Sequence, residues 1–267
     1  MPTASHDSPR ASGAASRASA PLDPAQLEAW LVEEPEAPLR VGPGRVTFAA
    51  RGTNGAEVIV KRFRGTPRGE RLRARLTLEA RRSPGRREYD ALVALAELGL
   101  PLPRALGWHE VGEDSLVVQE RVPFDETLRE RLTRRPQDAA HFRPAVEAIA
   151  LQLHAAGWYH RDLYLDHFLV RGDGPETTLI DVGRARHGTA PRARWFVKDL
   201  AALQHSTPAA VGPRPRLRLL ASWLDARGVT GRRARRRWAR AILRKAQRMA
   251  AHVPRGGTSF PEPEAAP

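Results

Sequence analysis

Apolar and polar residues alternate along several short stretches of the chain, as they do in half-buried strands. We expect strands at residues 45–51, 57–63, 105–109, 115–121, 168–170 and 178–180. Residues 52–55 and 172–174 are rich in Gly, Asn and Asp, and they provide the turns of two hairpins. The pattern predicts a small antiparallel sheet in the first half of the chain and a short strand pair farther on.

Other stretches repeat their apolar residues at the spacing of a helix. We expect helices that start at Pro24 and Lys198 and helices that cover residues 69–81, 84–98, 126–134, 143–156, 216–227 and 230–252. Asp23 before Pro24 is a typical helix start, and Gly99 and Gly157 are typical helix ends. Helices therefore dominate the second half, and the two patterns together predict an α+β fold.

The last expected helix is strongly basic. Between residues 231 and 249 it carries nine Lys and Arg residues and no acidic one. Thr230 is expected to cap it, and its expected apolar stripe is Trp238, Ile242, Leu243 and Met249. Such a helix attracts an anionic membrane, where each basic residue is worth about 1 kcal/mol, or nucleic-acid phosphates. A helix that packs its stripe on the protein and solvates its arginines explains the pattern equally well.

The amino-acid composition favours some classes of binding partner and excludes some kinds of metal site. The formal net charge of +14 favours anionic partners such as nucleotides, phosphorylated lipids or a membrane surface, although a solvated arginine-rich surface gives the same balance. The 267 residues include no Cys, which excludes disulfides and thiolate metal sites. No apolar run approaches the roughly 18 residues of a membrane span, and the N-terminus lacks a secretory h-region. We therefore expect a cytoplasmic protein.

A polar group lies between two apolar segments at residues 158–170. His160, Arg161 and Asp162 follow Trp158 and Tyr159, and the chain becomes apolar again at Phe168. This order is typical of the His-Arg-Asp catalytic loop of kinases, in which the Asp orients or accepts the proton of the attacking hydroxyl. The kinase Asn five residues after the Asp is replaced here by His167. Asp166 is a further carboxylate that we consider as an auxiliary metal ligand.

Three charged residues outside the loop match other kinase positions. Lys61 ends an apolar strand and corresponds to the lysine that kinases direct at nucleotide phosphates, although a solvated strand lysine is common. Glu88 lies in the first turns of the helix expected at residues 84–98, where kinases have the glutamate that pairs with that lysine. Asp181 ends the strand of residues 178–180 and precedes Val182 and Gly183, the position of the kinase metal-binding Asp. Mg²⁺ prefers such hard oxygen ligands and takes few from the protein.

With these residues in view, the chain resembles the lipopolysaccharide kinases of the Kdo/WaaP type, which have a protein-kinase-like fold. The similarity is carried by residues 159–169, 179–185 and 194–200, together with residues 87–89 and 99–101, and it spans roughly residues 38–210. It implies transfer of the γ-phosphoryl group of ATP to a sugar hydroxyl of the lipopolysaccharide core (Kdo or heptose) or of a related glycolipid. The family also has His at the position of His167.

The resemblance implies a role for each site residue. Asp162 would orient the acceptor hydroxyl, Asp181 would hold Mg²⁺, and His167 would bind the second metal or a phosphate. Lys61 and Glu88 would position the α and β phosphates of ATP.

The resemblance also implies a two-lobed organisation. The nucleotide-binding N-lobe would comprise residues 23–121 and the catalytic C-lobe residues 122–253, with disordered ends at residues 1–22 and 254–267. The basic helix would place the protein peripherally on the inner face of the membrane. We do not expect nucleic acid as a partner.

Three other interpretations of the sequence are each opposed by one of its features. A protein Ser/Thr kinase is opposed by the short segment after Asp181, which has no Ala-Pro-Glu motif. A kinase-like scaffold that binds membrane or nucleic acid is opposed by the presence of Lys61, Glu88, Asp162 and Asp181. A metal hydrolase built on the His and Asp residues of the loop is opposed because those residues lie in one loop without a second ligand group elsewhere.

Overall fold

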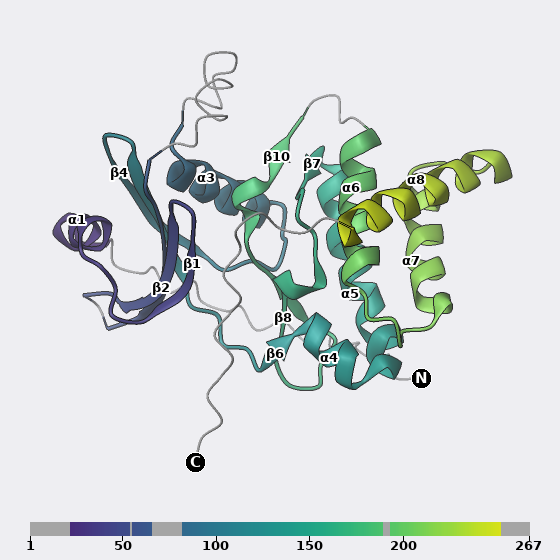
Figure 1. Ribbon diagram of the computed structural model, residues 1–267, viewed down its shortest axis with the longest axis horizontal. Helices are drawn as coiled ribbons and strands as arrows, with labels where there is room; N and C mark the ends of the chain where they lie inside the picture. Colours follow the sequence, from purple (N-terminus) through teal and green to yellow (C-terminus); the bar gives the residue numbers. More distant parts are fainter. Residues whose placement is uncertain (1–21, 54, 66–81, 189–192, 252–267) are drawn as a thin grey trace, which may run out of the picture.

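A computed structural model describes residues 22–53, 55–65, 82–188 and 193–251. Of the ends predicted to be disordered, residues 1–21 and 254–267 lie outside the described residues. The helix expected at residues 69–81 lies outside them too. Within the described residues an antiparallel sheet and a group of helices lie beside each other (Figure 1). This confirms the expected α+β class, with the sheet first in the chain.

The main sheet has five strands in the order β1-β2-β3-β5-β4. Their bounds are Pro38–Gly42 for β1, Arg45–Arg51 for β2, Glu57–Phe63 for β3, Ala105–Val111 for β4 and Asp114–Glu120 for β5. All neighbouring strands are antiparallel. The hairpins β2–β3 and β4–β5 match the strands expected from the sequence. The edge strand β1 was not predicted.

The two faces of the sheet pack against different helices. Helix α1 (Pro24–Val32) begins at its predicted cap, Asp23, and packs Leu27 and Leu31 against a small core. Alternation along β3 turns Val58 and Val60 toward that core and Lys61 to the opposite face. Helix α3 (Pro84–Glu97) covers the second face and contacts β3, β4 and β5.

Helix α3 also joins the sheet to the rest of the protein. Its buried Leu92 and Leu95 belong to the same apolar core as Leu153 and Phe168 of the helical part. The helical part contains α4 (Leu128–Arg134), α5 (Ala139–Ala155), α6 (Ala193–Ser206), α7 (Pro213–Ala226) and α8 (Arg232–Ala250). Because one core spans both parts, the sheet face that carries Lys61 is held against the helical part. The boundary between residues 121 and 122 stays a prediction.

Two small sheets lie where the catalytic loop was expected. Strands β6 (Glu126–Thr127), β8 (Phe168–Val170) and β9 (Thr177–Leu179) form one, and β7 (Trp158–Tyr159) pairs with β10 (Arg186–His187) in the other. The β8–β9 hairpin confirms the predicted strand pair to within one residue. The loop of residues 160–167 therefore runs from the end of β7 to the start of β8.

Several local predictions were wrong. Helices α5 and α6 begin at Ala139 and Ala193, earlier than expected, and residues 126 and 127 form a strand instead of a helical turn. The helical spacing of Leu217, Leu220 and Trp223 predicts that all three face inward, but Leu217 is 62% exposed. Leu243 of the expected stripe is 49% exposed. Helix α8 has Gly231 at its N-cap instead of Thr230, with no side-chain cap. The buried core residues of these two helices are Trp223, Leu224, Ile242 and Ala246, and Leu219, Leu220, Trp238 and Met249 pack against the core.

Candidate active site

A buried ion pair links the sheet to helix α3. The Nζ atom of Lys61 donates a hydrogen bond to Oε1 of Glu88 at 2.5 Å, and the two residues are 5% and 0% exposed. Lys61 comes from β3 and Glu88 from the second turn of α3, as the sequence predicted. A buried charge without a partner is costly, so each residue holds the other in place. The lysine is thereby fixed on the inner face of the sheet.

Asp181 lies next to this pair. Its carboxylate is 3.5 Å from Lys61 Nζ, 3.2 Å from Arg45 Nη2 and 3.9 Å from Arg40 Nη1. Its backbone is left-handed, with φ of 60°, which directs the chain away from the end of β9. Burial raises the pKa of Asp181, but the positive charges of Lys61 and Arg45 outweigh this and hold that pKa well below its usual range. The carboxylate is therefore ionised at neutral pH.

His167 connects the two aspartates. Its Nδ1 atom lies 2.8 Å from the backbone carbonyl of Asp162, and its Nε2 atom lies 3.8 Å from Oδ2 of Asp181. A carbonyl only accepts, so Nδ1 carries a proton and the neutral ring has its lone pair on Nε2. That lone pair and the Asp181 carboxylate face one region. A contact chain thus runs from Glu88 through Lys61, Asp181 and His167 to Asp162.

Asp162 is held by two cations. Arg184 Nη1 donates to Oδ2 at 2.9 Å, and Lys198 Nζ donates to Oδ1 at 3.3 Å. Burial lowers the pKa of Lys198, while the charge of Asp162 opposes that shift. The Asp162 side chain is 16% exposed. It is therefore a fixed carboxylate that a ligand from solvent can still reach.

The backbone of the catalytic loop is anchored by Asp199 from α6. Its buried carboxylate accepts hydrogen bonds from the backbone N–H groups of His160 at 2.8 Å and Arg161 at 2.6 Å. It also contacts His154 Nε2 at 3.2 Å, and His154 Nδ1 accepts from the indole N–H of Trp223 at 2.8 Å. Since Nδ1 accepts, the proton of a neutral His154 is on Nε2, facing Asp199. Arg161 has a positive φ of 71°, and these bonds hold it there.

The structure thus brings together Lys61, Glu88, Asp162, His167 and Asp181, all of which the sequence singled out. Asp166 is different. It is 44% exposed and pairs with Arg129 of α4 at 3.4 Å, so it faces that helix and no contact joins it to the other carboxylates. The auxiliary role considered for Asp166 has no support from its contacts.

Sequence reasoning missed four residues of the site. Arg45 lies one strand away from Lys61, in the pairing Arg45–Phe63, and alternation puts it on the same face as Lys61. That register was available from the predicted β2–β3 hairpin. Arg184, Lys198 and Asp199 stand in motifs that had been noted, but no local pattern relates them to Asp162. The Gly42-Pro43-Gly44 turn closes the β1–β2 hairpin, and the arginines beside it, Arg40 and Arg45, reach Asp181.

An antiparallel sheet with a buried Lys–Glu pair, joined to a helical part that carries an aspartate loop, defines a protein-kinase-like phosphotransferase with an alcohol group as acceptor. The chain belongs to the lipopolysaccharide kinase (Kdo/WaaP) family, whose sequence profile matches residues 29–248. The resemblance inferred from the sequence motifs is thereby confirmed.

Known relatives agree with this assignment. Over 202 residues the chain is 32% identical to the lipopolysaccharide core heptose(I) kinase WaaP of Pseudomonas aeruginosa, covering 67% of this chain and 74% of that one. It is 26% identical over 171 residues to the protein of the same name from Escherichia coli, covering 58% of this chain and 64% of that one. It therefore spans less than two thirds of the second relative. A crystal structure of aminoglycoside-3'-phosphotransferase of type VIII matches with a TM-score of 0.49 and 18% identity over 75% of this chain and 93% of that chain.

The site residues fit magnesium-bound ATP. Mg²⁺ takes one or two protein oxygens and completes its shell with phosphates and water. Among the described residues no group of three or more His, Asp and Glu side chains could hold a metal ion. Asp181, whose carboxylate is ionised and lies 3.8 Å from Nε2 of His167, would be the oxygen ligand. Arg45 and Lys61, both beside Asp181, would offer the positive charge that phosphates require.

Position 183 requires glycine because it lies very close to the side chain of Glu88. A Cβ atom at Gly183 would lie 2.6 Å from Oε2 of Glu88, much closer than a carbon–oxygen contact allows. We expect Gly183→Ala to displace Glu88 from Lys61, to lower the free energy of unfolding by about 1–3 kcal/mol and to weaken Mg-ATP binding. Denaturant unfolding and ATP titration would measure the two effects. Gly212→Ala, whose new Cβ meets nothing within 4 Å, is the matched control and should change neither. Unchanged ATP affinity in Gly183→Ala would contradict this role of the pair.

In the described part of the chain no helix combines the length and the apolar character that a bilayer span requires.

Proposed function

We propose that this protein transfers the γ-phosphoryl group of ATP to a sugar hydroxyl of the lipopolysaccharide core. The observation that carries the proposal is the continuous chain of contacts from Glu88 and Lys61 to Asp181, His167 and Asp162. A nucleotide-binding charge pair, a metal-binding carboxylate and a catalytic carboxylate are the parts that phosphoryl transfer to an alcohol needs. The family membership supports a lipopolysaccharide sugar as acceptor. The names of the two bacterial relatives favour heptose over Kdo.

In the proposed reaction Asp162 orients the acceptor hydroxyl and accepts its proton. The hydroxyl oxygen forms a bond to the γ-phosphorus, the bond from that phosphorus to the β–γ bridging oxygen breaks, and ADP leaves. Lys61, oriented by Glu88, contacts the α and β phosphates. Asp181 and His167 hold Mg²⁺, which when bound offsets the negative charge of the phosphates. Arg45 adds a further positive charge beside Asp181.

Helix α8 supports a peripheral position on the inner face of the membrane. Arg233, Arg236, Arg237 and Arg240 are exposed on it, and such residues attract anionic lipids without inserting. The apolar residues Ile242 and Ala246 are buried against the protein, so the attraction is electrostatic. ATP is a cytoplasmic substrate, and we place the protein in that compartment.

The test is phosphate transfer from labelled ATP, in the presence of Mg²⁺, to a dephosphorylated lipopolysaccharide core. We expect label on the core, and mass spectrometry of the product identifies the phosphorylated sugar as heptose or Kdo. Label on Kdo alone would show that the acceptor sugar is Kdo instead of heptose, and the proposed reaction would stand. Label on a generic protein and none on the core would overturn the proposal in favour of a protein kinase.

A further inference from the structure

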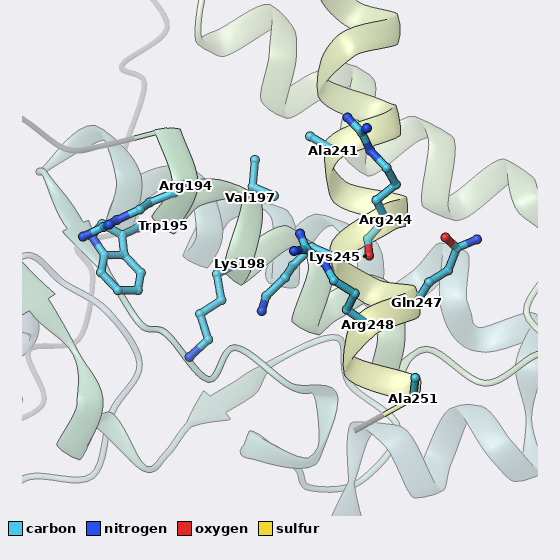
Figure 2. A pocket seen from close by; sticks show the side chains of 10 residues that line it. All are labelled: Arg194, Trp195, Val197, Lys198, Ala241, Arg244, Lys245, Gln247, Arg248 and Ala251. Atoms are coloured by element: carbon cyan, nitrogen blue, oxygen red, sulfur yellow. Dashed lines mark hydrogen bonds between the residues drawn. The ribbon is translucent and has the colours of Figure 1, made fainter. Parts of the chain in front are cut away.

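A groove of about 900 Å³ lies between helices α6 and α8, on the helical side of the catalytic loop. It is lined by five basic side chains and no acidic one: Arg194, Lys198, Arg244, Lys245 and Arg248. Figure 2 shows Lys198 extending from α6 and Lys245 and Arg248 extending from α8 toward the same space. The groove is therefore a concave surface with a single sign of charge.

The spacing of residues on α8 explains how these cations come to face the groove. Ala241, Arg244, Lys245 and Arg248 recur at helical intervals and lie on one side of the helix. The buried positions Ile242 and Ala246 are on another side and pack against the core. The small side chain of Ala241 leaves room beside α6, and the longer cations line the rest of the wall.

The groove cations of α8 have no acidic partner within the described residues. Arg235, earlier on the same helix, pairs with Asp225, but none of the described carboxylates is within ion-pair distance of Arg244, Lys245 or Arg248. Like charges gathered around one hollow repel one another. This repulsion lowers the stability of the protein when the groove is empty. An anion bound in the groove would relieve it and would be stabilised by all of these cations.

Lys198 connects the groove to the proposed catalytic centre. It lines the groove, and its Nζ atom lies 3.3 Å from Oδ1 of Asp162. The groove therefore begins next to the carboxylate at which the acceptor hydroxyl must lie. Asp181 and Lys61, which would bind the nucleotide, are on the sheet side of the same loop. Donor and acceptor would thus approach Asp162 from different sides.

We propose that this groove is the acceptor subsite and that it recognises the acidic groups of an anionic oligosaccharide, carboxylate or phosphate, on sugars next to the one that is phosphorylated. This inference rests on the proposed function and specifies its substrate. Lysine and arginine both bind such anions, and a set of them spaced along a groove suits a chain of sugars with several charges. A membrane surface is a poorer match, because a flat bilayer does not enter a concave groove as far as Lys198 and Lys245, which are only partly exposed.

The test is binding of lipid-free core oligosaccharide by isothermal titration calorimetry, without ATP. The probes are the oligosaccharide with its carboxylates free and phosphate removed, the same compound with its carboxylates converted to methyl esters, and the phosphate-bearing oligosaccharide. We expect Lys245→Ala/Arg248→Ala to weaken binding of the acidic probes by about tenfold for each cation removed. The neutral methyl ester should bind the wild type and the variant equally. The probe that loses most affinity identifies carboxylate or phosphate as the recognised group.

Arg214→Ala/Arg218→Ala is the matched control, since it removes two exposed cations of α7 outside the groove. It should leave every affinity unchanged. Equal affinities of wild type and Lys245→Ala/Arg248→Ala for the acidic probes would overturn the inference, and continued label transfer by that variant would leave the proposed kinase activity intact. Groove-dependent binding without any transfer would instead uphold the subsite and overturn the proposed reaction.

A vesicle assay distinguishes the membrane alternative. If Lys245→Ala/Arg248→Ala lost its binding to phosphatidylglycerol vesicles and kept its affinity for the acidic oligosaccharides, the groove would be a membrane contact and the inference would be wrong. We expect the opposite pattern. In transfer assays the variant should raise the KM for the acceptor, with the KM for ATP unchanged.

Discussion

Asp162→Asn should lower phosphate transfer to the lipopolysaccharide core by about 100-fold to 10,000-fold, the range that loss of a general base gives. The amide keeps the size of the side chain but cannot accept the hydroxyl proton. Arg184 and Lys198 would lose a charged partner at the same time. The measurement is the rate of label transfer at saturating ATP and acceptor.

Asp166→Asn is the control for this variant. Asp166 lies in the same loop, four positions later, but it is exposed and pairs with Arg129. It should retain nearly full activity, because exposed ion pairs contribute at most about 1 kcal/mol. Mg-ATP should still raise the melting temperature of Asp162→Asn, which shows that the nucleotide site is intact. Near-normal transfer by Asp162→Asn would exclude Asp162 as the catalytic carboxylate.

Asp181→Asn should abolish the rise in melting temperature that Mg-ATP produces and should lower transfer by at least about 100-fold. An amide oxygen carries no full charge, so it is a weaker Mg²⁺ ligand than a carboxylate. The substitution also leaves Lys61 and Arg45 without the anion between them. Thermal unfolding with ATP, in the presence and absence of Mg²⁺, separates loss of the metal from loss of the fold. A magnesium-dependent shift that survives in the variant would contradict the role of Asp181.

The pH dependence of the wild type provides a check on Asp181. Its folded pKa is depressed, so the stability it contributes is present above its unfolded value near 3.8 and is lost only as the pH falls through the folded pKa. Between pH 5 and pH 8 Asp181 does not titrate. An acid limb of activity in that interval must therefore come from another group.

The sequence alone was sufficient to predict the candidate site residues that occupy characteristic positions in strands, loops or helix starts. Lys61 and Asp181 end apolar strands, Asp162 and His167 belong to the His-Arg-Asp loop, and Glu88 lies just after a helix start at Ser83 and Pro84. Their contacts follow from the sheet register and from the first turns of α3. Local pattern is enough when the neighbours of a residue are themselves local or belong to one hairpin.

Residues that act across the helical part could not be found in the same way. Asp199 lies on α6 and reaches the loop backbone only through tertiary packing of α6. Lys198 comes next to Asp162 for the same reason. The inside of α7 was misjudged because Leu217 and Trp223 have similar apolar character, and only packing decides that Trp223 is buried. Helix α5 begins at Ala139, earlier than predicted, because the residues before Pro144 continue the helix in the N-terminal direction and Pro144 does not interrupt it.

The anchoring of the catalytic loop has a consequence for motion within the site. Asp199 accepts hydrogen bonds from backbone N–H groups of the loop, and it contacts His154, which is hydrogen-bonded to Trp223. The loop that carries Asp162 is therefore fixed by contacts with three helices. Across the site, Arg40 and Arg45 reach Asp181 through long side chains from an edge hairpin, and Arg40 is 55% exposed. The catalytic loop is therefore more rigid than the hairpin that carries Arg40 and Arg45. We therefore expect nucleotide entry and exit to involve movement of the β1–β2 hairpin that carries Arg40 and Arg45, while Asp162 keeps its position when the acceptor binds.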